Sequence, residues 1–446
     1  MKFNYGSIWK MSYPLLFSLL IQQLIGITDV IYLERVSEVA LAGSALGSTY
    51  FFTVFIIAFG FSIGAQIIMA RRNGEKRYSR IGEVLYQGCA FLFVLAFVGI
   101  FLSKWLTPHF LQLIISSPEV YEAAYQYIDW RMWGLVCASL IIMMRSFLVA
   151  ITTTCILTFI SLVMVLANII LNYIFIFGKF GFPAMGIAGA AFASNLSEII
   201  TVVACVVYFA LKIDLQKYGL LKFVYAKWSL LKSILQVSFW TMVQQFVSVF
   251  SWFLFFVAIE HLGEKELAVS NILRSVSSFP YVIINSFGAV ASSLTGNLIG
   301  QRHSKAVMPV CHRIMNLCAL LVMPVLIAMT VFTYPILRVY TDNNELIALS
   351  VAPYWVMLVS FIVSAPAWIL FCTASGTGNT RVAFFMELVS LVFYSMHIVL
   401  VVLVYKLSLA WCWTADAVYN IVILVLSALY LYSGKWHGKK CNFSVG

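Results

Sequence analysis

The chain has 446 residues, of which 62% are hydrophobic and only 10% are charged. This composition excludes an ordinary soluble globular protein and predicts an integral membrane protein. The net charge of +11 does not require a nucleic-acid partner, and we expect none, because positive charge in membrane proteins usually collects in cytoplasmic loops.

Apolar segments near or above the roughly 20 residues that a helix needs to cross a bilayer recur along the chain. They predict twelve transmembrane helices at Ser12 to Leu33, Leu41 to Ala70, Val84 to Leu102, Met132 to Ile151, Cys155 to Phe177, Ile187 to Leu211, Ile234 to Ala258, Leu273 to Ile299, Met315 to Thr333, Val351 to Thr373, Val382 to Val404 and Leu409 to Tyr432. The predicted fold class is therefore an all-α integral membrane protein.

Lysine and arginine residues indicate the orientation of these helices. If the N-terminus is cytoplasmic, most of them fall on the cytoplasmic side, including Arg71, Arg72, Lys76, Arg77 and Arg80 after the second segment. An even number of spans then returns the C-terminus to the same side. We expect a multi-pass protein of the cell (inner) membrane with both termini in the cytoplasm.

Asp29 is an acidic side chain near the outer end of the otherwise apolar first segment. A carboxylate at membrane depth costs about 2.5–3.5 kcal/mol on insertion scales, so the default interpretation is a site for an ion, a proton or a substrate. This residue is the most informative single feature of the chain.

The two halves of the chain resemble each other. The matching positions are Gln22 and Gln23 with Gln244 and Gln245, the turn at Gly74 with the turn at Gly300, and Thr154 with Thr380. Their common order predicts two six-helix repeats, at residues 1–222 and 223–446. Because six is even, we expect parallel lobes related by a pseudo-twofold axis along the membrane normal, with a central cleft for substrate.

Three further polar residues are predicted at nearly the depth of Asp29. Asn168 and Asn172 are four residues apart in the fifth segment, so they share a helix face, and Ser194 lies in the outer part of the sixth. One carboxylate, two amide oxygens and a hydroxyl suit either Na⁺ or a titrating proton. Burial favours a neutral carboxyl and an arriving cation favours the carboxylate, which gives a physical basis for exchange. The alternative is that the amides and the hydroxyl only link helices.

Other polar residues are candidates for further sites. Gln22, Glu198 and Gln245 could line a substrate cavity, with Glu198 one helical turn below Ser194. His397 and Asp416 are predicted at equal depth in the last two segments. They form either a titratable pair or a structural hydrogen bond.

Glu387 lies near the cytoplasmic end of the eleventh segment. A charged side chain close to the end of a transmembrane helix usually extends its head group to the membrane surface. We expect this behaviour of Glu387 and assign it no function.

Several stretches resemble the multidrug and toxic compound extrusion (MATE) transporters. The most specific is Ala167 to Ala193, ANIILNYIFIFGKFGFPAMGIAGAAFA, which is similar to the family's fifth helix, outer loop and start of the sixth helix. Thr28, Asp29 and Val30 fit the acidic position of the family's first helix, and the loops at Gly74 and Gly300 fit its turns after helices two and eight. The resemblance extends over nearly the whole chain.

This resemblance implies a secondary antiporter that exports amphipathic, often cationic organic molecules while Na⁺ or H⁺ enters. The family's cation site in the first lobe maps onto Asp29, Asn168 and Asn172, with Ser194 at a hydroxyl-bearing position, and Na⁺ there is the only metal we expect. The archaeal branch carries a second aspartate at the position of Asn172, so Asp29 is the single carboxylate of this cluster.

The sequence departs from the family's pattern in the second lobe. The sodium-coupled branch places acids on helices seven and ten, whereas the matching stretches here, Val243 to Phe250 and Ser364 to Trp368, contain none. A coupling mechanism in the first lobe is therefore expected. The implied partners are small organic substrates and membrane lipid, and we expect a monomer.

Two other function classes are alternatives. A flippase of the same superfamily would carry a lipid-linked precursor, but its pyrophosphate cargo favours a basic cavity, whereas the ionisable residues within these segments are mostly acidic. An intramembrane enzyme or an ATPase is disfavoured because the sequence has neither an HExxH motif nor a P-loop. We expect no catalytic residues, no organic cofactor and no ATPase subunit.

Overall fold

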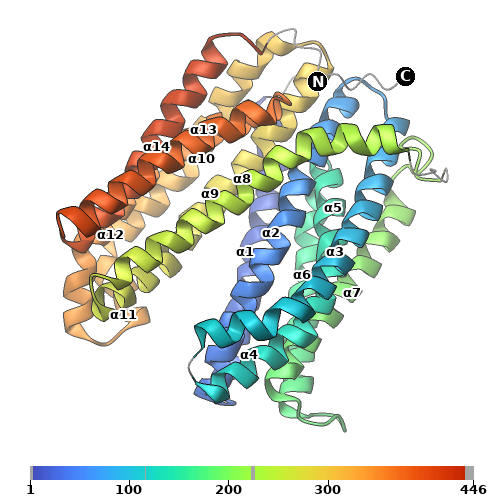
Figure 1. Ribbon diagram of the computed structural model, residues 1–446. Coiled ribbons are helices and arrows are strands. Elements are labelled where there is room, and N and C mark those ends of the chain that lie inside the picture. The colour runs from blue at the N-terminus through green and yellow to red at the C-terminus, as the bar shows by residue number, and fades with distance from the viewer. Residues whose placement is uncertain (1–3, 116, 222–226, 437–446) are drawn as a thin grey trace. The chain divides into compact units, whose positions relative to one another are not determined.

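The computed structural model describes residues 4–115, 117–221 and 227–436. These residues form helices, and no strand occurs among them (Figure 1). The same part of the chain contains 12 segments that are long and apolar enough to cross a membrane. The predicted all-α class and the predicted number of spans are therefore confirmed.

Contacts divide the chain into two units. The N-terminal unit is Tyr13–Met242, and the C-terminal unit combines Met1–Ser12 with Val243–Gly446. The predicted lobe boundary, between residues 222 and 223, lies outside the described residues. The helices of the first half of the chain are α1 (Tyr5–Glu34), α2 (Glu38–Gly74), α3 (Ser79–Ile114), α4 (Pro118–Arg131), the 3₁₀ turn η1 (Met132–Gly134), α5 (Leu135–Ala150), α6 (Cys155–Phe177) and α7 (Gly186–Lys212).

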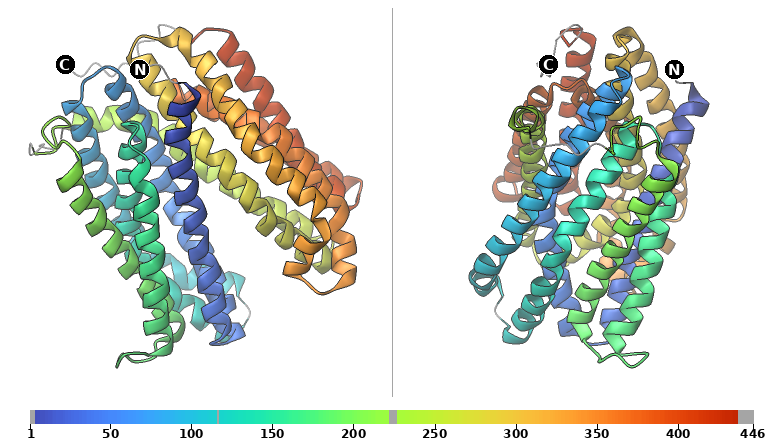
Figure 2. Two further views of the ribbon diagram at one scale, coloured as in Figure 1. Left: turned by 180° about the vertical axis from the view of Figure 1, so that it is seen from behind. Right: turned by 90° about the vertical axis from the view of Figure 1, so that its right-hand side faces the viewer.

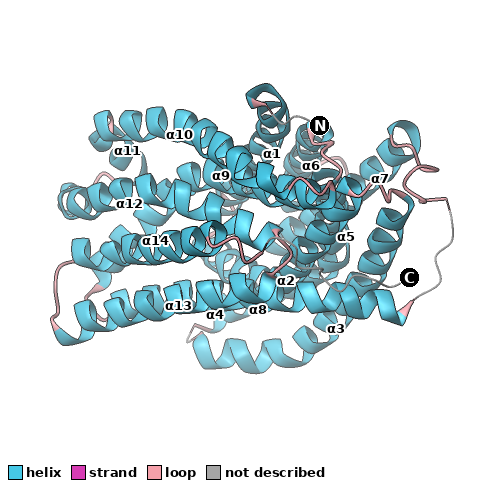
Figure 3. Cartoon of the chain, turned by 90° about the horizontal axis from the view of Figure 1, so that it is seen from above, coloured by secondary structure: helices cyan, strands magenta, loops and turns pink. Residues whose placement is uncertain are grey.

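The second half of the chain is also helical in the part that the structure describes. Its helices are α8 (Trp228–Glu260), α9 (Glu264–Gly300), the 3₁₀ turn η2 (Ser304–Ala306), α10 (Val307–Val331), α11 (Thr333–Tyr340), α12 (Asn344–Gly376), α13 (Thr380–Ile398), the π-helical turn η3 (Val399–Val404) and α14 (Leu409–Tyr432). Within the C-terminal unit, α10, α12, α14 and α13 run side by side in that order (Figure 3).

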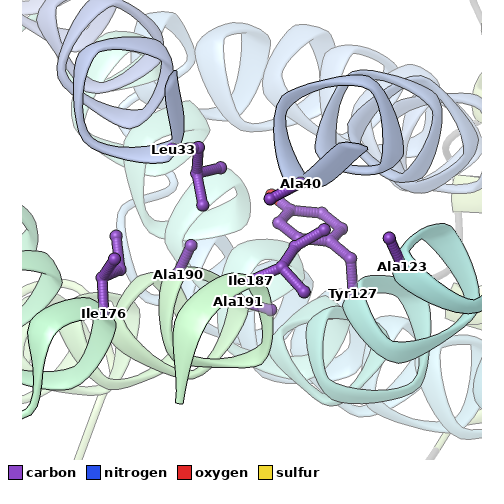
Figure 4. Close-up of a cluster of buried hydrophobic side chains, with 8 residues drawn as sticks. All are labelled: Leu33, Ala40, Ala123, Tyr127, Ile176, Ile187, Ala190 and Ala191. Carbon is purple, nitrogen blue, oxygen red and sulfur yellow. The ribbon is translucent and has the colours of Figure 1, made fainter. Parts of the chain in front are cut away.

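Small residues bring the helices of the N-terminal unit close together. A buried cluster joins α1, α2, α4, α6 and α7 through Leu33, Ala40, Ala123, Tyr127, Ile176, Ile187, Ala190 and Ala191 (Figure 4). A Cβ atom at Gly43 would lie 2.7 Å from the Cβ of Ala123, and one at Gly189 would lie 2.6 Å from the carbonyl oxygen of Phe175. Close helix approach through small residues is typical of membrane proteins.

The turn between α6 and α7 sets the register of these two helices. Gly178 ends α6 in the left-handed conformation with φ 65°, and the backbone N–H of Met185 donates to the carbonyl oxygen of Phe175. The two helices therefore run side by side as a hairpin (Figure 2). This hairpin carries most of the polar residues of the candidate site.

The sequence Gly60–Gly64, GFSIG, matches the G-x-S-x-G pattern of hydrolases but lies within α2. A catalytic serine of that type needs a sharp turn between a strand and a helix, which α2 does not provide. Its glycines serve packing instead, because Cβ atoms at Gly60 and Gly64 would lie 2.6 Å from Met242 Cα and 2.3 Å from Ser238 Oγ on α8.

Most spans extend beyond their predicted bounds, and two differences stand out. The fourth span begins at Pro118, not at Met132, because α4 is an amphipathic helix whose charged residues interrupt the apolar pattern. A short helix, α11, follows the ninth span and was not predicted. Both differences arise where polar residues follow helical periodicity without forming a long apolar run.

Candidate functional site

Asp29 lies beside the amide of Asn172. The Nδ2 atom of Asn172 donates to Asp29 Oδ1 at 2.6 Å and to Asn168 Oδ1 at 3.0 Å. Asn168 Nδ2 in turn donates to Ser194 Oγ at 3.2 Å. The structure therefore brings together the polar residues that were predicted at a common depth, in one hydrogen-bonded chain from α1 through α6 to α7.

The amides of this chain are fully enclosed, whereas the carboxylate is partly exposed. Asn168 and Asn172 are both 0% exposed, and Asp29 is half-buried. The Oδ1 atom of Asn172 is buried without a hydrogen-bond partner among the described residues. Buried acceptors are usually satisfied, so this oxygen is suited to receive a cation or a donor group that binds at Asp29.

A second acid of the N-terminal unit, Glu198, is bound by arginine. Arg131 Nη2 lies 2.5 Å from Glu198 Oε1, and Arg131 Nη1 lies 3.1 Å from Glu198 Oε2. Nη1 also donates to Asn195 Oδ1 at 2.9 Å, and the guanidinium lies 3.8 Å from the centre of the Phe51 ring. Such a bidentate ion pair fixes the position of the carboxylate and balances its charge.

The packing around this ion pair depends on a glycine. A Cβ atom at Gly134 would lie 2.2 Å from Arg131 Nη1, 2.2 Å from Asn195 Oδ1 and 2.7 Å from Glu198 Oε2. Asn195 Nδ2 also donates to the carbonyl oxygen of Trp130 at 2.6 Å. Arg131 thus balances the charge of Glu198, and the predicted place of Glu198 in the lining of a substrate cavity stays a prediction.

Arg131 is close enough to Asp29 for their charges to interact, and Tyr127 interacts with both. No hydrogen bond or ion pair joins Arg131 to Asp29 within the described residues; the guanidinium is held by Glu198 and Asn195. The sequence analysis did not single out Arg131, which directly precedes the predicted fourth span. The available signal was its place at the end of the amphipathic stretch Pro118–Arg131, directly before an apolar segment.

Gln22 and Gln245, the other residues predicted to line a cavity, have different surroundings. Gln22 Nε2 donates to Ser161 Oγ at 2.8 Å and to Ser18 Oγ at 3.3 Å, so it links α1 to α6. Gln245 is half-buried in α8, and its neighbour Gln244 has a buried Oε1 atom without a partner among the described residues. The proposed role of Gln22 and Gln245 in substrate binding stays a prediction.

His397 and Asp416 are not joined. His397 Nε2 lies 2.8 Å from Thr414 Oγ1 and 3.3 Å from the carbonyl oxygen of Trp411. No hydrogen bond connects it to Asp416 in the part of the chain that the structure describes, although Asp416 interacts electrostatically with Tyr394. The equal depth predicted for the two residues did not translate into a hydrogen bond between them.

The expectation for Glu387 is wrong. Its side chain does not extend to the membrane surface but is buried, with 2% exposure. Ser248 Oγ donates to Glu387 Oε1 at 2.6 Å, and Tyr419 Oη donates to Glu387 Oε2 at 2.9 Å. The hydroxyls of α8 and α14 hold the carboxyl inside the C-terminal unit, and the sequence alone does not show which helices flank α13.

Comparison with known proteins gives consistent matches over most of the chain. The family model described as MatE matches residues 14–174 and 241–403. A "Probable multidrug resistance protein NorM" of Thermotoga maritima is 26% identical over 435 residues, covering 96% of this chain and 92% of that protein. A protein of the same name from Neisseria meningitidis serogroup B is 26% identical over 343 residues, covering 76% and 74% of the two chains.

Solved structures share the fold. A transporter of the MOP superfamily from Pyrococcus furiosus, described as having a binding pocket of reverse polarity, matches with a TM-score of 0.87 at 18% identity, covering 96% of this chain and 95% of that one. An outward-facing multidrug resistance transporter of the MATE family matches with a TM-score of 0.86 at 18% identity, covering 97% and 96%. At this level of identity the likeness extends to the fold alone.

Proposed function

Because the chain belongs to the MatE family of multidrug efflux transporters, we propose that it is a secondary antiporter that works by alternating access. It exports amphipathic, often cationic organic compounds, and protons or sodium ions enter in exchange. Asp29, Asn168, Asn172 and Ser194 form the exchange site. The observation that carries this proposal is the contact between Asp29 and a neutral amide whose own oxygen has no partner.

Asp29 needs a positive partner whenever it is ionised. A charge inside a membrane span is expensive unless it is balanced, and Arg131, the basic residue that interacts with Asp29, is already bound by Glu198 and Asn195. The partner must therefore come from outside the protein. A proton, a sodium ion and an organic cation compete for one carboxylate, and this competition is the physical basis of antiport.

The neighbours of Asp29 fit both coupling ions. Asp29, Asn168 and Asn172 would supply Na⁺ with carboxylate and amide oxygens, which are hard ligands of the kind that such ions prefer. A proton would instead neutralise Asp29 directly, and the surrounding burial favours that neutral form. We keep both ions in the proposal, and the experiment below separates them.

The flippase alternative is not supported by the surroundings of Asp29. A lipid pyrophosphate needs basic side chains that are free to bind it. Arg131 is held by Glu198, so its charge is balanced within the protein. We therefore treat lipid translocation as a control assay, in which we expect no activity.

The direct test is dye efflux from proteoliposomes with a pH gradient and a sodium gradient imposed separately. Asp29→Asn should reduce gradient-driven efflux of cationic dyes to the level of empty vesicles. Asp342→Asn is the matched control, because Asp342 is exposed in the loop before α12 and should leave efflux unchanged. Undiminished efflux by Asp29→Asn would refute the role of Asp29, and the gradient that drives the wild type identifies the coupling ion.

A further inference from the structure

Glu387 is surrounded by helices of the C-terminal unit. Ser248 on α8 and Tyr419 on α14 donate hydrogen bonds to its two oxygens. Tyr281 on α9 and Cys372 on α12 are close enough to interact with it electrostatically. Four helices, α8, α9, α12 and α14, thus contribute side chains that interact with this carboxyl.

None of these neighbours carries a positive charge. The titratable groups that face Glu387 among the described residues are Tyr419, Tyr281 and Cys372, and α8 contributes only the hydroxyl of Ser248. Glu198, by contrast, is bound by Arg131. An unpaired carboxyl that is 2% exposed within a membrane span is expected to have a function, because keeping its charge there is costly.

The hydroxyl of Ser248 can serve two protonation states of Glu387. Its Oγ atom lies 2.6 Å from Glu387 Oε1 and 3.0 Å from the carbonyl oxygen of Gln244. A serine hydroxyl has one proton and can donate it to only one acceptor at a time, while its oxygen can also accept. When Glu387 is ionised, Ser248 donates to it, and Tyr419 donates to the other oxygen.

When Glu387 is protonated, the direction of this bond reverses. The carboxyl O–H donates to Ser248 Oγ, and Ser248 donates to the carbonyl oxygen of Gln244. Tyr419 continues to donate to the second carboxyl oxygen. Both states are then fully hydrogen-bonded without any movement of a heavy atom, and the gain of one proton from water is the only chemical difference between them.

We propose that Glu387 is a second exchange site, in the C-terminal unit, and that its ligand is a proton. A metal ion fits less well, because the two hydroxyl groups beside Glu387 donate their protons to it and no other carboxylate among the described residues interacts with it. Tyr281, which interacts electrostatically with Glu387, is 48% exposed. The coupling of this proton to efflux rests on the proposed function, whereas its binding does not.

Infrared difference spectroscopy tests the binding of this proton directly. The full chain in lipid nanodiscs is compared at acidic and alkaline pH, and the carbonyl stretching band of protonated carboxyl groups is recorded. Glu387→Gln should remove one component of this band. Glu264→Gln, which changes an exposed glutamate at the start of α9, is the matched control and should remove none.

Two variants that keep the carboxyl provide a second measurement. Ser248→Ala removes the acceptor of the carboxyl proton, so the Glu387 component should move to higher wavenumber. Tyr419→Phe removes the donor to the other oxygen and should also shift it upwards. If Glu387→Gln leaves the band unchanged, or if Ser248→Ala and Tyr419→Phe shift nothing, Glu387 does not exchange a proton. Loss of the Glu387 component on addition of Na⁺ at constant pH would also overturn the proposal.

The two proposals fail in different ways. If Asp29→Asn transports normally while Glu387→Gln loses its infrared component, the assigned role of Asp29 is wrong and the proton site stands. If the infrared component is absent while Asp29→Asn stops efflux, only the proton site is wrong. If both stand, efflux driven by a pH gradient should be lost in Glu387→Gln and retained in Glu264→Gln.

Discussion

Asp29 and Glu198 are both carboxylates within the spans of the N-terminal unit, but their partners differ. Glu198 is bound through both oxygens by the guanidinium of Arg131, whereas Asp29 accepts a hydrogen bond from the neutral amide of Asn172. The charges of Arg131 and Glu198 balance each other within the protein. Asp29 has no ion-pair partner of this kind among the described residues. The comparison shows that an acid in a membrane span indicates a binding function only once its internal partners are known.

The largest expected effect comes from breaking the ion pair of Arg131 and Glu198. Arg131→Met leaves Glu198 buried without its counter-charge, which should lower stability by about 3–5 kcal/mol. Thermal unfolding of the purified protein measures this change. Adding Glu198→Met to the same chain removes the unpaired charge and should recover most of the loss. A double variant as unstable as Arg131→Met alone would show that the pair acts mainly through packing.

An intermediate effect comes from giving Asp29 a permanent partner. Asn172→Lys places an ammonium group beside Asp29 and should stop gradient-driven efflux, because the carboxylate no longer needs an external cation. The longer side chain should also destabilise the fold by about 1–3 kcal/mol through overpacking. Asn172→Met is the control for length without charge, and its efflux should be weaker than that of the wild type but still respond to the gradient. Equal efflux by the two variants would contradict the exchange role of Asp29.

The smallest expected effect concerns the link between α1 and α6. Gln22→Leu removes the hydrogen bond to Ser161 on α6 and the longer one to Ser18 within α1. The loss of the bond between the helices should cost about 0.6 kcal/mol, the average for such bonds in membrane proteins. If Gln22 only joins the helices, dye efflux per molecule should remain unchanged. A loss of efflux without a loss of stability would instead support its predicted place in a substrate cavity.

The sequence was sufficient to predict features that depend on composition and periodicity. Apolar runs located the spans, and depth along the helix together with the four-residue spacing of Asn168 and Asn172 brought the Asp29 cluster together. Each of these quantities is a property of one helix at a time. For this reason they could be obtained without knowing how the helices pack.

The remaining contacts depend on rotation and neighbours, which a single sequence does not specify. His397 and Asp416 were predicted at one depth, yet no hydrogen bond joins them among the described residues, because depth along a helix does not specify which side of it faces a neighbour. Glu387 is enclosed because α8 and α14 flank α13 and present hydroxyls. Arg131 reaches Glu198 because α4 packs against α7, and the place of Arg131 at the end of the amphipathic α4 does not by itself identify Glu198 as its partner.

The missing side chain of Gly134 has a consequence for the history of this protein. Any larger residue there would collide with Arg131, Asn195 and Glu198, so the glycine and the charged pair can be lost in evolution only in a restricted order. A lineage that acquires alanine at this position should already have given up the arginine and the glutamate. Among homologues, these positions should therefore change together, and a chain that keeps the pair should keep the glycine.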